Sequence, residues 1–98
     1  MTELQSHFDE FRLVLVAQMR ELSALEPEHQ TTGWYLLKYF RRIHKKVTVS
    51  TSARGVENTI RALIRFYVDK IDEGSELEER CKHVLRSHRR SLRLDRQT

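Results

Sequence analysis

Apolar residues recur at helical spacing through the first quarter of the chain, at intervals that alternate between four and three residues. Such alternation is a seven-residue repeat, which is typical of a helix with one continuous apolar seam. We predict a helix over residues 2–25 that begins at a capping box formed by Thr2 and Gln5 and stops at Pro27. The predicted seam consists of Leu4, Phe8, Phe11, Leu15, Gln18, Leu22 and Leu25.

Three later segments show helical periodicity and carry signals for helix ends. The apolar stripe expected on the third helix consists of Val56, Ile60, Leu63, Ile64, Tyr67, Val68 and Ile71. Thr31 or Thr32 suits the N-cap of the second helix, and Ser75 with Glu78 forms a capping box for the last one. Gly74 suits the left-handed position after the third helix. We predict these helices over residues 31–46, 53–73 and 75–93, followed by a frayed tail at residues 94–98.

The connections between the predicted helices are short. Residues 47–52 are mostly β-branched but too few to build a sheet alone, so we interpret them as an extended connector. Four helices joined by such connectors favour an all-α fold, a four-helix antiparallel bundle in a single domain over residues 1–93.

The first predicted helix is longer than its neighbour. At about 1.5 Å per residue it measures roughly 36 Å, against roughly 24 Å for the second. Because the apolar seam runs its full length, part of the seam is expected to project beyond the bundle. We therefore predict a homodimer in which this helix pairs with its symmetry mate and Gln18 sets the register near the two-fold axis. The alternative is that the helix bends around its own bundle.

Composition limits the class of protein. The 98 residues are 39% hydrophobic and 33% charged, which is typical of a globular domain and too apolar for a chain disordered throughout. Cys81 is the single cysteine, which excludes an intramolecular disulfide and favours an intracellular setting, cytoplasmic or nuclear. The sequence shows neither a signal peptide nor an apolar run long enough for a membrane span.

The charge of the chain is unevenly distributed. The net charge of +4 divides into −4 over residues 1–30 and +8 over residues 31–98. Two rows of cations stand out, each with i, i+3, i+4, i+7 spacing, which places four side chains on one helix face. The first basic stripe is Lys38, Arg41, Arg42 and Lys45, with Lys46 beside it, and the second basic stripe is Arg86, Arg89, Arg90 and Arg93.

Both stripes cost stability, because like charges one helical turn apart repel by a few tenths of a kcal/mol per pair. No acidic residue lies within residues 30–56 to neutralise the first stripe. Alternating charges would keep the same faces soluble, so the repeated rows favour contact with a polyanion. Seven residues of helix span roughly 10 Å, enough to reach successive phosphates, and arginine suits bidentate phosphate contact.

Other residues are weaker candidates for the same contact. Trp34 and Tyr35 flank the first stripe and have the chemistry to stack on a base, but we favour their packing against the preceding loop and the bundle rim. On the third helix the additional candidates are Arg54, Arg61 and Arg65, of which the last two are spaced for ordinary ion pairs with Glu57 and Asp69.

The chain carries no zinc-finger, helix-turn-helix or RNP signature and no cluster of base-reading side chains. Broad basic helix faces suit backbone and shape recognition, which is how A-form RNA is bound. We therefore predict a nucleic-acid-binding protein that prefers duplex RNA to DNA without strong sequence choice. In architecture alone, such a small helical dimer resembles viral double-stranded-RNA-binding proteins that suppress silencing or interferon responses, which implies a regulatory role.

The main alternative is a protein-interaction or adaptor module. It would dock through the acidic first helix, or present the basic amphipathic second helix to an acidic protein partner. A steep loss of affinity with salt separates nucleic-acid binding from this alternative. We expect no enzyme activity, cofactor or metal site, since no catalytic motif is present and Cys81 and His88 lie about 10 Å apart along one helix face.

Overall fold

The computed structural model describes residues 3–95, with side chains described for residues 7–93. Its helices are α1 (Glu3–Ala24), α2 (Thr32–Val47), the short 3-10 helix η1 (Ala53–Val56), α3 (Glu57–Lys70) and α4 (Glu76–Asp95). No strand occurs between residues 3 and 95, so the predicted all-α fold is confirmed. The predicted Thr2–Gln5 capping box and the side chain of Leu4 lie outside the described residues.

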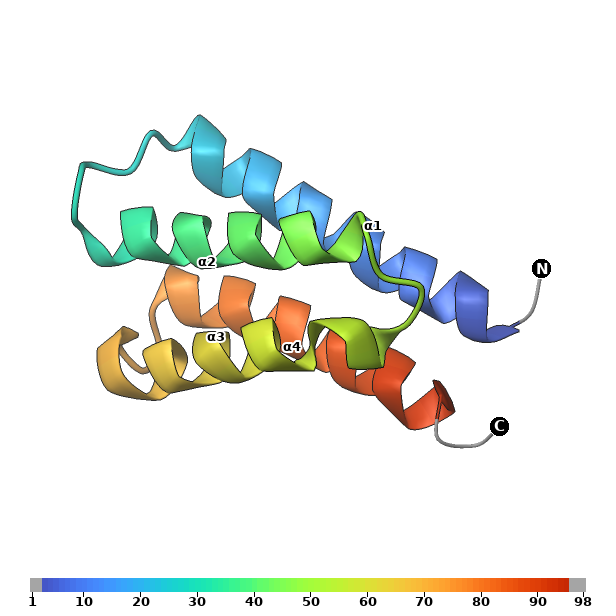
Figure 1. The fold of residues 1–98 in the computed structure, drawn as a ribbon. Helices are drawn as coiled ribbons and strands as arrows, with labels where there is room; N and C mark the ends of the chain where they lie inside the picture. The colour runs from blue at the N-terminus through green and yellow to red at the C-terminus, as the bar shows by residue number, and fades with distance from the viewer. Residues whose placement is uncertain (1–2, 96–98) are drawn as a thin grey trace.

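The helices form an antiparallel bundle. Consecutive helices run in opposite directions, so that α1 begins and α4 ends at the same end of the molecule (Figure 1). α1 packs along α4 and along α2, and α2 packs on α3, whereas the contact between α3 and α4 is much smaller. η1 lies among α2, α3 and α4. The bundle is therefore well packed on three sides and incompletely closed between α3 and α4.

The core is built from one apolar face of each helix. These faces follow the helical spacing of the sequence, because residues three and four apart share a side of the helix. Their most deeply buried apolar side chains are Phe11, Leu15, Leu22, Leu36, Phe40, Ile43, Val56, Leu63, Cys81 and Val84. One polar member, His88, is 4% exposed, and its Nε2 lies 2.8 Å from the carbonyl oxygen of Ala53. This contact ties α4 to η1.

The apolar seam of α1 packs inside its own chain. Leu25, at 57% exposure, leaves the core at the helix end, and Gln18 accepts a hydrogen bond of 3.0 Å from Arg80 of α4. α4 has 20 residues against 22 for α1, so α4 runs beside the seam where the shorter α2 does not reach. A homodimer through this seam would displace packing that one chain already provides. The buried seam residues are Phe8, Phe11, Leu15 and Leu22.

The connector and the third helix differ from the prediction. Residues after Val47 form turns, in which the backbone N–H groups of Val49 and Ser50 bond to carbonyls three residues back, instead of an extended segment. The predicted helix over residues 53–73 is divided into η1 and α3, and α3 ends at Lys70 because Ile71 is extended. Gly74, with φ +80°, therefore lies in the turn before α4 and not directly after α3.

The predicted capping signal of α4 is present in a modified form. Ser75 Oγ accepts a hydrogen bond of 3.2 Å from the backbone N–H of Glu78, as an N-cap serine does. The Glu78 carboxylate reaches one residue further back than in a capping box and accepts a bond of 3.0 Å from the N–H of Gly74. α4 continues to Asp95, two residues beyond the predicted end of this helix.

Candidate nucleic-acid interface

α2 separates a buried apolar face from the first basic stripe. The helix begins as predicted, because the side chain of Thr31 accepts a bond of 3.4 Å from the N–H of Trp34. Leu36, Phe40 and Ile43 are fully buried, so the opposite face points to solvent. The exposed residues of that face are Lys38, Arg41, Arg42, Lys45 and Lys46. Lys45 and Lys46 also lie in the last turn, where cations interact favourably with the helix dipole.

Aromatic rings support two cations of the first stripe. Lys38 Nζ lies 4.7 Å from the centre of the Trp34 ring, and the Arg42 guanidinium lies 5.5 Å from the centre of the Tyr39 ring. Tyr39 in turn stacks on Phe66 of α3 at 4.8 Å between ring centres. These contacts hold the two side chains over aromatic faces without neutralising their charge.

The ring of Trp34 is in contact with other side chains of the same protein. Its ring meets His29 at 4.5 Å and Tyr35 at 5.0 Å between ring centres, both edge to face, and Lys38 lies over it. A nucleic-acid base would have to displace Lys38 to stack on the face that Lys38 covers. Tyr35 is 38% exposed. The predicted packing of Trp34 against the preceding loop agrees with its contact with His29.

The second stripe lies on the exposed side of α4. Arg86 and Arg90 border a hollow shared with α1, and Arg86 and Arg89 border a groove shared with α3. Arg93 is exposed near the end of the helix. The opposite side of α4 carries the buried residues Cys81, Val84, His88 and Ser91.

No cation of either stripe forms an ion pair with a carboxylate among the side chains of residues 7–93. Several cations outside the stripes do form such pairs, so carboxylates are available on this surface and pair elsewhere. These pairs are Arg12–Asp9 at 3.5 Å, Arg61–Glu57 at 3.9 Å, Arg80–Glu21 at 3.4 Å, Arg80–Glu76 at 2.7 Å and Lys82–Glu78 at 3.5 Å. The stripes are left with uncompensated positive charge.

The two stripes form separate surfaces. α2 and α4 each pack on α1 but contact each other little. The hollow beside the first stripe is lined by Met19 of α1 together with residues of α2, and it shares no residue with the two hollows beside the second stripe. Helical spacing predicted each stripe but not this separation, because it places side chains on a helix and does not place the helix among its neighbours.

The basic candidates of the third predicted helix lie on two elements, η1 and α3. Arg54 is exposed in η1, and Arg65 is exposed on α3 without the ion pair to Asp69 that its spacing predicted. Arg61 forms the predicted pair with Glu57, at a long distance of 3.9 Å. Arg61 lines the same groove as Arg86 and Arg89 of the second basic stripe, whereas Arg54 and Arg65 line none of the three hollows beside the stripes.

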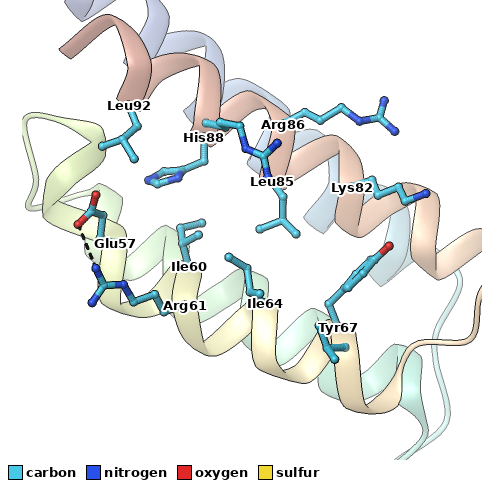
Figure 2. A pocket seen from close by; sticks show the side chains of 12 residues that line it. Glu57, Ile60, Arg61, Ile64, Tyr67, Lys82, Leu85, Arg86, His88 and Leu92 are labelled. Carbon is cyan, nitrogen blue, oxygen red and sulfur yellow. Dashed lines mark ion pairs between the residues drawn. The ribbon is translucent and has the colours of Figure 1, made fainter. Parts of the chain in front are cut away.

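Sequence reasoning missed an apolar groove between α3 and α4. The periodicity of the third helix placed Ile64 and Val68 in its core stripe, yet they are 42% and 72% exposed, and Phe66 is buried instead. The apolar stripe of this helix is wider than one face. Its width is the sequence feature that could have indicated apolar contacts on two sides of the helix. One side packs on α2 and the other lines the groove (Figure 2).

Other kinds of site find little support in the described part of the chain. Residues there offer no group of three His, Cys, Asp or Glu side chains arranged to hold a metal ion. None of the described helices is both long and apolar enough to cross a membrane. The chain matches no protein-family model, and no curated protein or solved structure shows significant similarity to it.

Proposed function

We propose that the protein binds the phosphate backbone of duplex nucleic acid, preferably RNA, without strong sequence choice. The first basic stripe is the principal contact, and the second basic stripe provides a separate one. The observation that carries the proposal is that all eight stripe cations are exposed and lack a carboxylate partner among the described side chains, whereas Arg12, Arg61, Arg80 and Lys82, which lie outside the stripes, each have one.

The first stripe is the stronger of the two contacts. Its segment contains no acid between residues 30 and 56, and aromatic rings hold Lys38 and Arg42 in place before any ligand arrives. Side chains that are already ordered lose less conformational entropy on binding. The spacing from Lys38 to Lys45 corresponds to roughly 10 Å of helix, which suits a run of neighbouring phosphates. Absence of base-reading residues on this face agrees with shape and backbone recognition.

The predicted homodimer is a distinct part of the proposal. It would double the basic surface, but its contact would lie outside the buried part of the α1 seam. Light scattering at micromolar concentration measures the molecular mass in solution. The mass of a single chain would refute the homodimer and would leave the proposal of nucleic-acid binding unchanged.

The test is a titration of labelled duplex RNA, duplex DNA and single strands of about 20 nucleotides, followed by fluorescence anisotropy. Affinity for the duplexes should fall steeply with salt, by a log–log slope of about 0.9 for each phosphate contact. Arg41→Glu with Arg42→Glu should abolish binding while the circular dichroism spectrum stays unchanged. The matched control is Arg20→Glu with Lys70→Glu, which makes the same change of net charge at exposed positions outside both stripes. Unchanged affinity of the Arg41/Arg42 variant would refute the assignment.

Trp34 offers a second readout from the same titration. It is the single tryptophan of the chain and lies under Lys38, so its fluorescence reports on the first stripe. Addition of unlabelled duplex RNA should change this fluorescence in the wild type and in the control variant. A duplex that binds without any change in Trp34 fluorescence would point to the second stripe as the principal contact.

A further inference from the structure

A groove of about 600 Å³ runs between α3 and α4, where the bundle is least closed. Its floor is apolar. Figure 2 shows Ile60 and Ile64 on α3 facing Leu85 and Leu92 on α4 across the groove, with Tyr67 at one end. Lys82 and Arg86 extend outward from α4, so that they border the groove without filling it.

The groove is preformed, because bonds tie its two walls near both ends. At one end Tyr67 of α3 donates a hydrogen bond of 3.0 Å to Glu78 of α4. Toward the other end His88 of α4 lies 2.8 Å from the carbonyl oxygen of Ala53 in η1, which leads directly into α3. Between these ties Ile64 is left 42% exposed, and Val68, next to Tyr67, is 72% exposed. Grooves lined by apolar side chains with polar groups at their border are the usual form of a binding site.

The border of the groove is positively charged. Four cations line it against one acid, Glu57, which is paired with Arg61. Lys82 is paired with Glu78, and Arg86 and Arg89 have no carboxylate partner among the described side chains. An occupant with negative charge beside an apolar stripe would complement both features, since charged borders steer and orient partners.

We propose that this groove binds an acidic amphipathic helix of a partner protein. The lining residues of α3 extend from Glu57 to Val68, which corresponds to about 16 Å, or three turns of a docked helix. Apolar residues at i, i+3 or i+4, and i+7 of the partner would enter the floor, as in helix-in-groove recognition. Its Asp and Glu residues would meet Arg86 and Arg89. The floor offers nothing to a phosphate backbone, which separates this site from the first basic stripe.

The inference does not depend on nucleic-acid binding. Arg86 and Arg89 also belong to the second basic stripe, so the groove is tested first through Ile64 and Val68, which belong to neither stripe. The probe is a displayed library of helical peptides of about 15 residues, or four turns, with apolar residues at the docking positions and all other positions varied. Selection is made on the wild-type protein and on Ile64→Asp with Val68→Asp. The matched control is Leu13→Asp with Val49→Asp, which are exposed apolar positions outside the groove.

Selected peptides should be rich in Asp and Glu, and synthetic copies should bind the wild type and the control alike. Ile64→Asp with Val68→Asp should weaken binding by about 30-fold, the effect of losing a buried hot spot. Arg86→Glu with Arg89→Glu should lower the affinity for the acidic peptides. Copies of these peptides in which Glu is replaced by Lys should bind the wild type poorly and this variant well. Circular dichroism confirms that each variant is folded.

Three outcomes would overturn the proposal. The first is a selection that yields no peptide dependent on Ile64 and Val68. The second is enrichment of basic or uncharged peptides at the groove. The third is a wild-type dimer in light scattering that Ile64→Asp with Val68→Asp converts to a monomer, which would make a second copy of the chain the occupant. Loss of duplex RNA binding in the Arg41/Arg42 variant would leave all three results unaffected.

Discussion

Tyr67 of α3 donates a hydrogen bond of 3.0 Å to Oε2 of Glu78, whose other carboxylate oxygen accepts a bond of 3.0 Å from the N–H of Gly74. One side chain therefore caps the start of α4 and ties it to α3. Hydrogen bonds from the N–H of Gly74 and, to a smaller extent, from the hydroxyl of Tyr67 lower the pKa of the Glu78 carboxyl, because both donors favour the charged form. Burial of Tyr67, with its bond to Glu78, raises the pKa of the Tyr67 hydroxyl.

Stability should depend on the ionisation of Glu78. A folded-state pKa below the ordinary value of 4.5 means that the charged carboxylate stabilises the fold fully above that value. The contribution is lost as the pH falls through the lowered folded-state pKa. Glu78→Gln should therefore be less stable than the wild type at about pH 7, and the difference should shrink toward about pH 3.

Urea denaturation at both pH values measures this difference in the free energy of unfolding. The control is Glu79→Gln, an exposed neighbour that forms none of these bonds. A gap between Glu78→Gln and wild type that stays the same at both pH values would show that the carboxylate charge is not what stabilises the contact.

Arg80 should matter for stability in a way that the stripe arginines do not. Its side chain is 14% exposed, and it donates hydrogen bonds to Gln18 at 3.0 Å and to Glu76 at 2.7 Å. Arg80→Met keeps most of the length of the side chain but removes its bond to Gln18 of α1 together with its bond to Glu76 within α4. We expect a loss of about 1–2 kcal/mol in the free energy of unfolding.

Arg86→Met is the comparison for Arg80, because Arg86 is exposed and has no ion pair among the described side chains. Its effect on the free energy of unfolding should stay within about 0.5 kcal/mol. Equal losses in the two variants would mean that the Gln18–Arg80 contact contributes nothing to the packing of α1 on α4.

Cys81 should be chemically inert in the folded protein. It is fully buried, and burial raises the pKa of its thiol to about 12, so the reactive thiolate is scarce near neutral pH. A thiol reagent such as dithiobis-nitrobenzoate should label the native chain slowly and the urea-unfolded chain fast. Labelling of the native chain at the unfolded rate would show that the α1–α4 side of the core opens readily.

Much of the fold follows from local pattern. Four helices, the Thr31 cap and the Ser75 contact at the start of α4 agree with the prediction, because spacing and capping are decided within a few residues of chain. The exposure of the first basic stripe follows in the same way from the burial of Phe40 and Ile43 on the opposite face.

The partner of each face is a property of the packed bundle. The buried residues of the α1 seam pack on α4 and α2 of the same chain, which the repeat did not predict, because a repeat indicates that a face is apolar and not which helix covers it. Ile64 looked like a core residue but borders an open groove, since α3 packs on α2 and barely on α4. The separation of the two basic stripes has the same cause. The spacing of residues within a few helical turns decides which side chains share a face. Contacts between segments far apart in the chain decide which helix packs against that face.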